Sequence, residues 1–179
     1  MFERFSREAR EAVVAAQEVA RTAGSRAIHT RHVLVPLAES KGPAARGLDA
    51  AGVDPVALAA GLRDEVRSAG LDPDALASLG IDLDAVGQRT DAVFGAGALD
   101  GAGRASRHVP FAPDAKKALQ LSLRETIRLG RRSIDGGGLL LGILRADCPA
   151  RASLTRAGVD LEVLRRSLEE PEAPGSRSA

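Results

Sequence analysis

The sequence predicts an all-α fold made of two copies of one four-helix segment, and three observations support this prediction. Small and branched apolar residues recur at helical spacing, as in Ala9, Val13, Ala16 and Ala20. The apolar–polar alternation typical of a half-buried strand is found in no part of the sequence. The chain also aligns with itself without a gap, which indicates pseudo-twofold internal symmetry.

This internal repeat is the strongest of the three observations. A shift of 106 residues places residues 5–62 on residues 111–168. The matched positions include Phe5 with Phe111, Gly24 with Gly130 and Leu34 with Leu140, and the tripeptide Gly-Val-Asp recurs at 52–54 and 158–160. Because the helix-breaking residues stay in phase over nearly the whole alignment, we interpret the repeat as a duplication.

Each copy is expected to form four helices. In the first copy we expect them at residues 7–22, 31–40, 43–52 and 54–68. Ser6 and Thr30 are residue types that cap the first turn of a helix, and Pro43 suits a first helical turn. Gly24 is expected to provide the left-handed residue that ends the first helix.

The segment between the copies is expected to add two short helices. The Gly–apolar–Asp pattern that separates helices recurs at 70–72 and 80–82, which predicts these helices within residues 70–94. Residues 95–107 are rich in Gly and Ala and predict a surface loop. We therefore expect one compact domain with a first repeat at 1–68, an insertion at 69–107, a second repeat at 108–170 and a disordered tail at 171–179.

The composition excludes several classes of function. The 179 residues contain four Phe and no Trp or Tyr, which argues against nucleic-acid binding by base stacking, and the net charge of +1 indicates no electrostatic steering. One cysteine, Cys148, permits no internal disulfide and is expected to be a small buried apolar residue. No apolar run reaches the roughly 20 residues of a membrane helix, and the charged N-terminal segment does not resemble a signal peptide. We expect a cytoplasmic protein without membrane contact.

Catalytic and metal-binding motifs are not recognised. His29 and His32 lie three residues apart, but no third ligand follows at a typical spacing, so we predict no metal site. The glycine-rich segment at 136–145 lacks the Lys-Ser/Thr of a phosphate-binding loop, and we expect neither ATP hydrolysis nor a cofactor. No arrangement of Ser, His and carboxylate indicates a nucleophile. The sequence predicts that the protein is not an enzyme.

Two segments resemble a known family. "MFERFSREAREAVVAAQEVA" and "VPFAPDAKKALQLSLRETIRLG" are similar to the two repeat starts of the Clp N-terminal domain, the amino-terminal module of ClpC- and ClpA-type unfoldases. The resemblance covers residues 1–68 and 108–169 and implies a platform that receives client proteins, adaptors or phosphoarginine-marked substrates. Since no ATPase motif is present, it suggests a stand-alone adaptor, regulator or decoy of a ClpC-type unfoldase.

The same resemblance indicates a changed ligand site. In the family one Glu in each repeat receives the guanidinium group of phosphoarginine, because a carboxylate accepts its paired hydrogen bonds. Arg31 and Gly137 stand at these positions, so we expect the phosphoarginine pocket to be lost. Arg31 is expected either to be a solvated surface residue or to attract an anion near a helix N-terminus. The resemblance also implies that His32 is structural and His29 exposed.

A candidate peptide groove completes the expectations. The matching family positions, which form a groove near the junction of the repeats, are Phe2, Val13, His108, Phe111 and Lys116. Because cyclic peptides bind this groove in some relatives, a second hypothesis is that the protein sequesters such peptides. The alternative is that Val13 and Phe111 are core residues, and a third hypothesis is a helical protein that has kept the fold and lost the binding.

Overall fold

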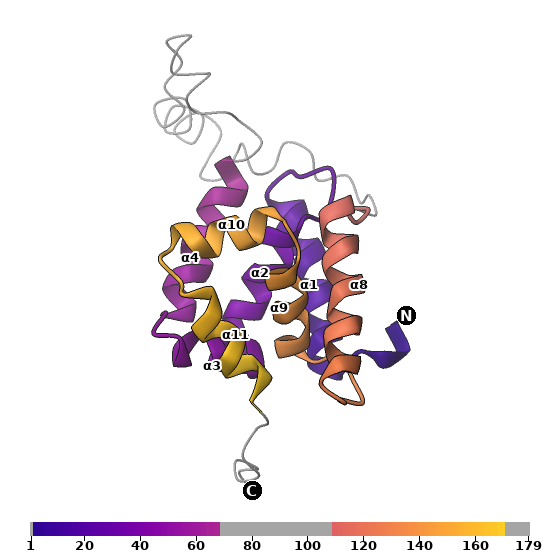
Figure 1. The fold of residues 1–179 in the computed structure, drawn as a ribbon. Coiled ribbons are helices and arrows are strands. Elements are labelled where there is room, and N and C mark those ends of the chain that lie inside the picture. The colour runs from indigo at the N-terminus through magenta and orange to yellow at the C-terminus, as the bar shows by residue number, and fades with distance from the viewer. Residues whose placement is uncertain (1, 69–108, 171–179) are drawn as a thin grey trace, which may run out of the picture.

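A computed structural model describes residues 2–68 and 109–170 of the chain (Figure 1). The first repeat contains a short 3-10 turn, η1 (Phe2–Arg4), followed by α1 (Arg7–Thr22), α2 (Thr30–Glu39), α3 (Pro43–Ala50) and α4 (Pro55–Ser68). These helices confirm the four that the sequence predicts. The expected helices within 70–94, the loop at 95–107 and the tail at 171–179 lie outside the described residues.

The start of α2 differs from the prediction. His29, and not Thr30, is the N-cap residue, and Thr30 is the first residue of the helix. The reason is that the Thr30 hydroxyl is engaged elsewhere, since it donates a hydrogen bond to Asp114 of the second repeat at 2.9 Å. The expectation for Ser6 is confirmed, because its hydroxyl accepts a hydrogen bond from the Ala9 amide at 3.1 Å.

The second repeat reproduces the backbone of the first. Its helices are α8 (Pro113–Arg128), α9 (Gly136–Arg145), α10 (Pro149–Arg156) and α11 (Leu161–Glu169). The first three begin and end at the residues that the 106-residue shift predicts. Gly24 and Gly130 both have φ of 65°, and Gly52 and Gly158 both have φ of 77°. These left-handed residues end helices at equivalent positions, where glycine avoids the steric strain of a side chain.

Two short backbone bridges tie the repeats together. Phe5 pairs with Ile134, and Ile28 pairs with Phe111, so each bridge is the 106-residue image of the other. The hydrogen bonds of the two bridges run from Ile134 N to Arg4 O, Ser6 N to Ile134 O, Ile28 N to Pro110 O and Ala112 N to Ile28 O, at 2.7, 2.8, 2.8 and 2.9 Å. The segment before the first helix of each repeat thus crosses to the segment before the second helix of the other.

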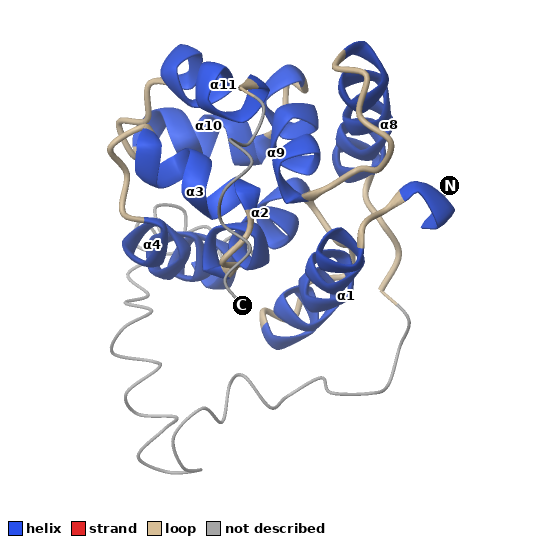
Figure 2. Ribbon diagram, turned by 90° about the horizontal axis from the view of Figure 1, so that it is seen from below, coloured by secondary structure: helices blue, strands red, loops and turns tan. Residues whose placement is uncertain are grey.

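The helices α2 and α9 lie at the centre of the molecule. α1 packs against α2 and α8 against α9, while α3, α4, α10 and α11 cover the opposite side of this pair (Figure 2). The close packing of α8 on α9 requires Gly142, because a Cβ atom there would lie 2.4 Å from the Ala118 carbonyl oxygen. Cys148 is buried in the core, as expected.

Candidate functional site

The five residues of the predicted peptide groove are only partly described. Val13 is 6% exposed and belongs to the core, as the alternative interpretation had it. Phe111 is half-buried against the core, and Lys116 is exposed on α8. The side chain of Phe2 and all of His108 fall outside the described part of the structure. Neither Val13, Phe111 nor Lys116 lines any of the three clefts described below.

Arg31 lies in the first turn of α2, where its charge is balanced from α4. Its Nη1 atom is 3.8 Å from a carboxylate oxygen of Glu65, and its side chain is 26% exposed. A cleft of about 500 Å³ opens beside it, and the ionisable side chains that line this cleft are Arg26, Arg31, His29 and His32. No carboxylate of the described residues lines it. Arg31 is therefore an ion-paired rim residue rather than a free cation.

Gly137, the equivalent position in the second repeat, is buried in the first turn of α9. A Cβ atom there would lie 3.2 Å from Cβ of Pro43, which leaves little room for a longer side chain. The neighbouring cleft of about 480 Å³ is lined by both signs of charge, including Arg131 and Asp135. Asp135 is already engaged, since it accepts a hydrogen bond from the Gly138 amide at 2.7 Å and lies 3.8 Å from Arg131.

The two histidines have different roles, both of which the resemblance implied. His32 is 4% exposed, and its Nδ1 atom accepts a hydrogen bond from the His29 amide at 2.8 Å. Burial, with the nearby charges of His29 and Arg31, lowers the pKa of His32 to about 4, so the ring is neutral at physiological pH. His29 is exposed and lies 3.0 Å from Asp114. Within residues 2–68 and 109–170 no three potential ligands are grouped to hold a metal ion.

Asp114 forms the junction from the second repeat to the start of α2. One carboxylate oxygen accepts hydrogen bonds from both the amide and the hydroxyl of Thr30 at 2.9 Å, and the other faces His29. Burial alone would raise the pKa of Asp114, but the hydrogen bonds from Thr30 and His29 outweigh it and hold the pKa below its usual value. The carboxylate is therefore stabilised in its charged form.

Glu8 occupies the equivalent position in the first repeat, and its surroundings are unfavourable for a charge. Its carboxylate lies over the backbone at the starts of α3 and α9, so close that a Cβ atom at Gly42 would be 1.6 Å from Oε1. This oxygen is buried and has no hydrogen-bond partner. Burial, followed by the charge of Asp135, raises the pKa of Glu8 and outweighs the opposing effects of Arg46 and of a hydrogen bond with Ser40. Asp114 lies next to His29, whereas Glu8 lies near Asp135, the acidic residue at the matched position.

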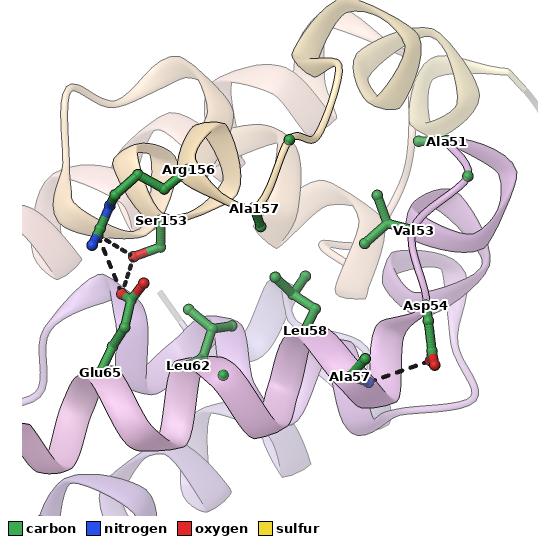
Figure 3. A pocket seen from close by; sticks show the side chains of 13 residues that line it. Ala51, Val53, Asp54, Ala57, Leu58, Leu62, Glu65, Ser153, Arg156 and Ala157 are labelled. Carbon is green, nitrogen blue, oxygen red and sulfur yellow. Dashed lines mark hydrogen bonds and ion pairs between the residues drawn. The ribbon is translucent and has the colours of Figure 1, made fainter.

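A third cleft, of about 530 Å³, lies between α4 and α10 (Figure 3). Leu58 and Leu62 of α4 form one wall, and the turns before α4 and after α10 contribute small and apolar residues. At one end Glu65 accepts hydrogen bonds from the Ser153 hydroxyl at 2.5 Å and from Arg156 at 3.3 Å. At the other end Asp54 caps α4 by accepting a hydrogen bond from the Val56 amide at 2.9 Å. We call this the α4–α10 cleft.

Around the α4–α10 cleft the two repeats differ at two matched positions. In the symmetry-related place α11 packs directly on α3, since Gly47 leaves room for Leu168: a Cβ atom at Gly47 would lie 2.5 Å from it. Ser167 of α11 also donates a hydrogen bond to the Gly47 carbonyl at 3.1 Å. The 106-residue images of Gly47 and Ser167 are Ser153 and Gly61. The Ser153 hydroxyl instead contacts α4 through Glu65, and Gly61 has no side chain that could repeat the hydrogen bond of Ser167.

Sequence reasoning missed this cleft, although a signal was present. The aligned repeats exchange glycine and serine at both positions, which is a direct indication that the two helix contacts differ. The ion pair between Arg31 and Glu65 had no such signal, because the two residues are far apart in the sequence and no spacing rule connects helices α2 and α4.

The fold and these clefts define an all-α domain of two interlocked four-helix repeats whose helix-lined grooves lie between the repeats. Comparison with protein families identifies it further. The family model for the Clp repeat N-terminal domain matches residues 4–70 and 67–155, and the chain belongs to this family. The resemblance found in the sequence is thereby confirmed.

Relatives of the chain include chloroplast Clp chaperone proteins. It is 31% identical over 183 residues to chaperone protein ClpC1 of Oryza sativa subsp. japonica, an alignment that covers 98% of the chain and 16% of that protein. It is 32% identical over 146 residues to chaperone protein ClpC1 of Arabidopsis thaliana, covering 81% of the chain and 12% of the relative. The chain thus spans a small part of the length of these relatives.

Solved structures support the fold. The N-terminal domain of the chaperone ClpD from Arabidopsis thaliana has a TM-score of 0.61 at 18% identity, with 94% of the chain and 96% of that domain covered. A structure from a malarial protein secretion system has a TM-score of 0.65 at 11% identity. The match covers 93% of this chain and 92% of the chain in that structure. None of the described helices is both long and apolar enough to cross a membrane.

Proposed function

We propose that the chain is a non-catalytic docking module that binds protein or peptide segments in Clp-dependent proteolysis. In this role it acts in the cytoplasm as an adaptor, regulator or decoy for a ClpC-type unfoldase or for the clients of one. Membership in the Clp repeat N-terminal domain family supports the proposal. The helix-lined clefts are the surfaces on which binding depends.

Binding is proposed to proceed without phosphoarginine recognition. The observation that carries this point is the pair of substitutions at Arg31 and Gly137. A guanidinium group approaching α2 meets another guanidinium whose carboxylate partner, Glu65, is already occupied. At α9 it meets a buried glycine, and the nearby Asp135 carboxylate is held by its own hydrogen bond and by Arg131. Neither position itself carries the carboxylate with which a guanidinium makes paired hydrogen bonds, and the nearby Glu65 and Asp135 are already engaged.

A degradation assay tests the docking role. Fluorescein-labelled casein is degraded by a ClpC-type unfoldase with its peptidase, with and without the full chain in excess over the ring. The expected result is a changed degradation rate, together with co-sedimentation of the chain with the ring. If the chain neither co-sediments nor alters the rate, the role as adaptor, regulator or decoy is wrong.

Calorimetry tests the loss of phosphoarginine recognition separately. Titration of the chain with free phosphoarginine is expected to give no heat beyond dilution, whereas a ClpC-type N-terminal domain that retains both carboxylates serves as the positive control. Saturable binding by this chain would overturn the assignment of Arg31 and Gly137 as disabling substitutions.

A further inference from the structure

The cleft beside Arg31, which we call the α2 cleft, is lined by charged side chains of one sign. It has a volume of about 500 Å³ and lies where the turn after α1 meets the first turn of α2. Arg26 and Arg31 line it together with His29 and His32, and none of the described acidic residues does. Arg26 is exposed on the turn and forms no ion pair with a described residue. A cleft with this lining is electrostatically complementary to an anion.

His32 provides a buried hydrogen-bond donor inside the α2 cleft. The residue is 4% exposed and lines the cleft. Its Nδ1 atom accepts the His29 amide, and the ring is neutral because its pKa is about 4, so the ring proton is on Nε2. Nε2 donates to no described residue, yet it is not sealed inside the protein, since Oε1 of Glu8 is the one buried and unpartnered side-chain atom in the described ranges. This N–H group therefore faces the cleft and lacks an acceptor.

Two carboxylates near the cleft are already engaged. Asp114 accepts the amide and the hydroxyl of Thr30 at the start of α2. Glu65 has Arg156 at 3.3 Å, whereas Arg31 lies farther away, at 3.8 Å. A guanidinium group carries five N–H donors, so Arg31 keeps donors for a ligand in the cleft while it remains near Glu65.

The second repeat holds a carboxylate at the matched place. The position equivalent to His29 is Asp135, whose carboxylate accepts the Gly138 amide at 2.7 Å and lies 3.8 Å from Arg131. There the chain itself places a carboxylate at a helix N-terminus beside an arginine, an arrangement that the helix dipole favours. At α2 the N-cap residue is a histidine, so the first repeat lacks this carboxylate and has the side chain of His32 where the second has Gly138.

We propose that the α2 cleft binds a carboxylate of a partner protein, an Asp or Glu side chain that accepts hydrogen bonds from Nε2 of His32 and from the guanidinium groups of Arg26 and Arg31. The proposal rests on the docking role and gives it a ligand chemistry opposite to that of a guanidinium. A carboxylate suits these donors because its planar oxygens accept paired hydrogen bonds from a guanidinium and have lone pairs left for an imidazole N–H. The site belongs to the first repeat, since Gly138 has no side chain that could donate.

Two variants test the cations of the site, and a third is their control. Arg26→Gln removes a charge that is exposed and has no ion-pair partner among the described residues, so the variant should fold as stably as the wild type. Arg31→Gln removes the second charge. Arg132→Gln is the matched control, because Arg132 is the 106-residue image of Arg26, is also exposed and lines none of the three clefts.

The probe is the peptide acetyl-Gly-Glu-Gly-amide, and acetyl-Gly-Gln-Gly-amide is its uncharged counterpart. Each is titrated into the full chain at neutral pH and low salt, and ¹⁵N–¹H spectra of the backbone and of the His32 ring follow binding. We expect the glutamate peptide to shift the signals of residues 23–32 and of Nε2 of His32 in a saturable way, and the glutamine peptide to leave them in place. Arg26→Gln and Arg31→Gln should each weaken binding about fivefold, the effect of losing one partly exposed charge pair, and Arg132→Gln should leave the affinity unchanged.

Several results would contradict the proposal. These are no binding of the glutamate peptide, equal shifts with both peptides, shifts confined to residues outside the α2 cleft, or wild-type affinity in both Arg26→Gln and Arg31→Gln. A parallel titration with inorganic phosphate tests the class of anion. If phosphate binds at the same signals more tightly than the glutamate peptide, the ligand is a phosphate and the assignment to a carboxylate is wrong.

The degradation assay separates this proposal from the docking role. If the full chain changes the degradation of casein but the glutamate peptide does not bind, the carboxylate site alone is wrong. If the peptide binds in the α2 cleft while the chain neither co-sediments with the ring nor changes the rate, the docking role alone is wrong.

Discussion

The two repeats meet at two symmetry-related junctions that have the same backbone geometry. The electrostatic surroundings of the carboxylate are favourable at one junction and unfavourable at the other. At one junction Asp114 accepts three hydrogen bonds at the start of α2 and faces His29. At the other, Glu8 reaches the start of α9 with a buried oxygen that has no hydrogen-bond partner, and its neighbour is Asp135. The comparison shows that the duplication conserved the path of the chain while the side-chain energetics of the two halves became different.

The largest effect is expected from the protonation of a buried histidine in acid, and this histidine, His32, lies in the first repeat. The pKa of His32 is about 4 in the folded protein, whereas an unfolded histidine has a pKa near 6.5. Below pH 6.5 the unfolded chain therefore binds the proton first, and stability is lost as pH falls toward 4, by about 2–3 kcal/mol. Urea unfolding between pH 7 and pH 4 measures this loss.

The control for this prediction is a comparison of two variants. His32→Gln removes the titrating ring and should flatten the pH dependence of the free energy of unfolding between pH 7 and pH 4. His29→Gln should leave most of this pH dependence in place. The equivalent of His32 in the second repeat is Gly138, which cannot contribute. An NMR titration in which the His32 ring gains its proton near pH 6.5 would contradict the burial argument.

The next effect breaks the favourable junction. Asp114→Ala removes the acceptor for both hydrogen bonds of Thr30 and should lower the free energy of unfolding by about 2 kcal/mol. Glu8→Ala, its matched partner, should cost far less, because one carboxylate oxygen there has no hydrogen bond to lose. Urea unfolding at pH 7 measures both, and equal losses would show that the two junctions are energetically alike.

A smaller effect is expected when the contact between α3 and α11 is changed toward the arrangement of α4 and α10. Gly47→Ser brings a side chain against Leu168 and should lower the free energy of unfolding by about 1 kcal/mol as α11 moves away from α3. The reciprocal change, Ser153→Gly, releases Glu65 from one hydrogen bond and places on α10 the residue that stands at the matched position of α3. It should narrow the α4–α10 cleft. A crystal structure of the variant would show this change. No loss of stability in Gly47→Ser would contradict the steric explanation.

The smallest effect is a gain in stability, and it concerns the junction at Glu8. Because the pKa of Glu8 is raised in the folded protein, its carboxyl is protonated in both states at acidic pH and imposes no penalty there. As pH rises through the folded pKa, the unfolded state loses the proton more readily and stability falls. Glu8→Gln should therefore raise the free energy of unfolding at pH 7, by about 0.5 kcal/mol after screening by solvent.

The pH dependence checks this assignment. The gain of Glu8→Gln over the wild type should disappear below the ordinary pKa of a glutamate. A gain that is constant from pH 7 to acidic pH would point to packing of the amide, and not to the charge of Asp135, as its cause.

Much of the fold followed from the sequence, because its signals are local. The caps, the left-handed glycines and the apolar periodicity depend on neighbours within one helical turn, and the 106-residue repeat extended each assignment to the second half. The family resemblance further implied a buried His32 and an exposed His29, as observed. The start of α2 was placed at the wrong cap residue because Asp114, which holds Thr30, lies in the other repeat.

The sequence by itself determined the described helices and their duplication, and it places Arg31 and Gly137 where the family resemblance implies carboxylates. Only the tertiary structure decided the partner of Arg31, the contrast between Glu8 and Asp114, and the α4–α10 cleft. These features depend on which side chains meet when helices from different repeats pack. At Gly47 the packed contact with Leu168 leaves no space for a side chain, whereas Ser153 at the matched position hydrogen-bonds to Glu65 of α4.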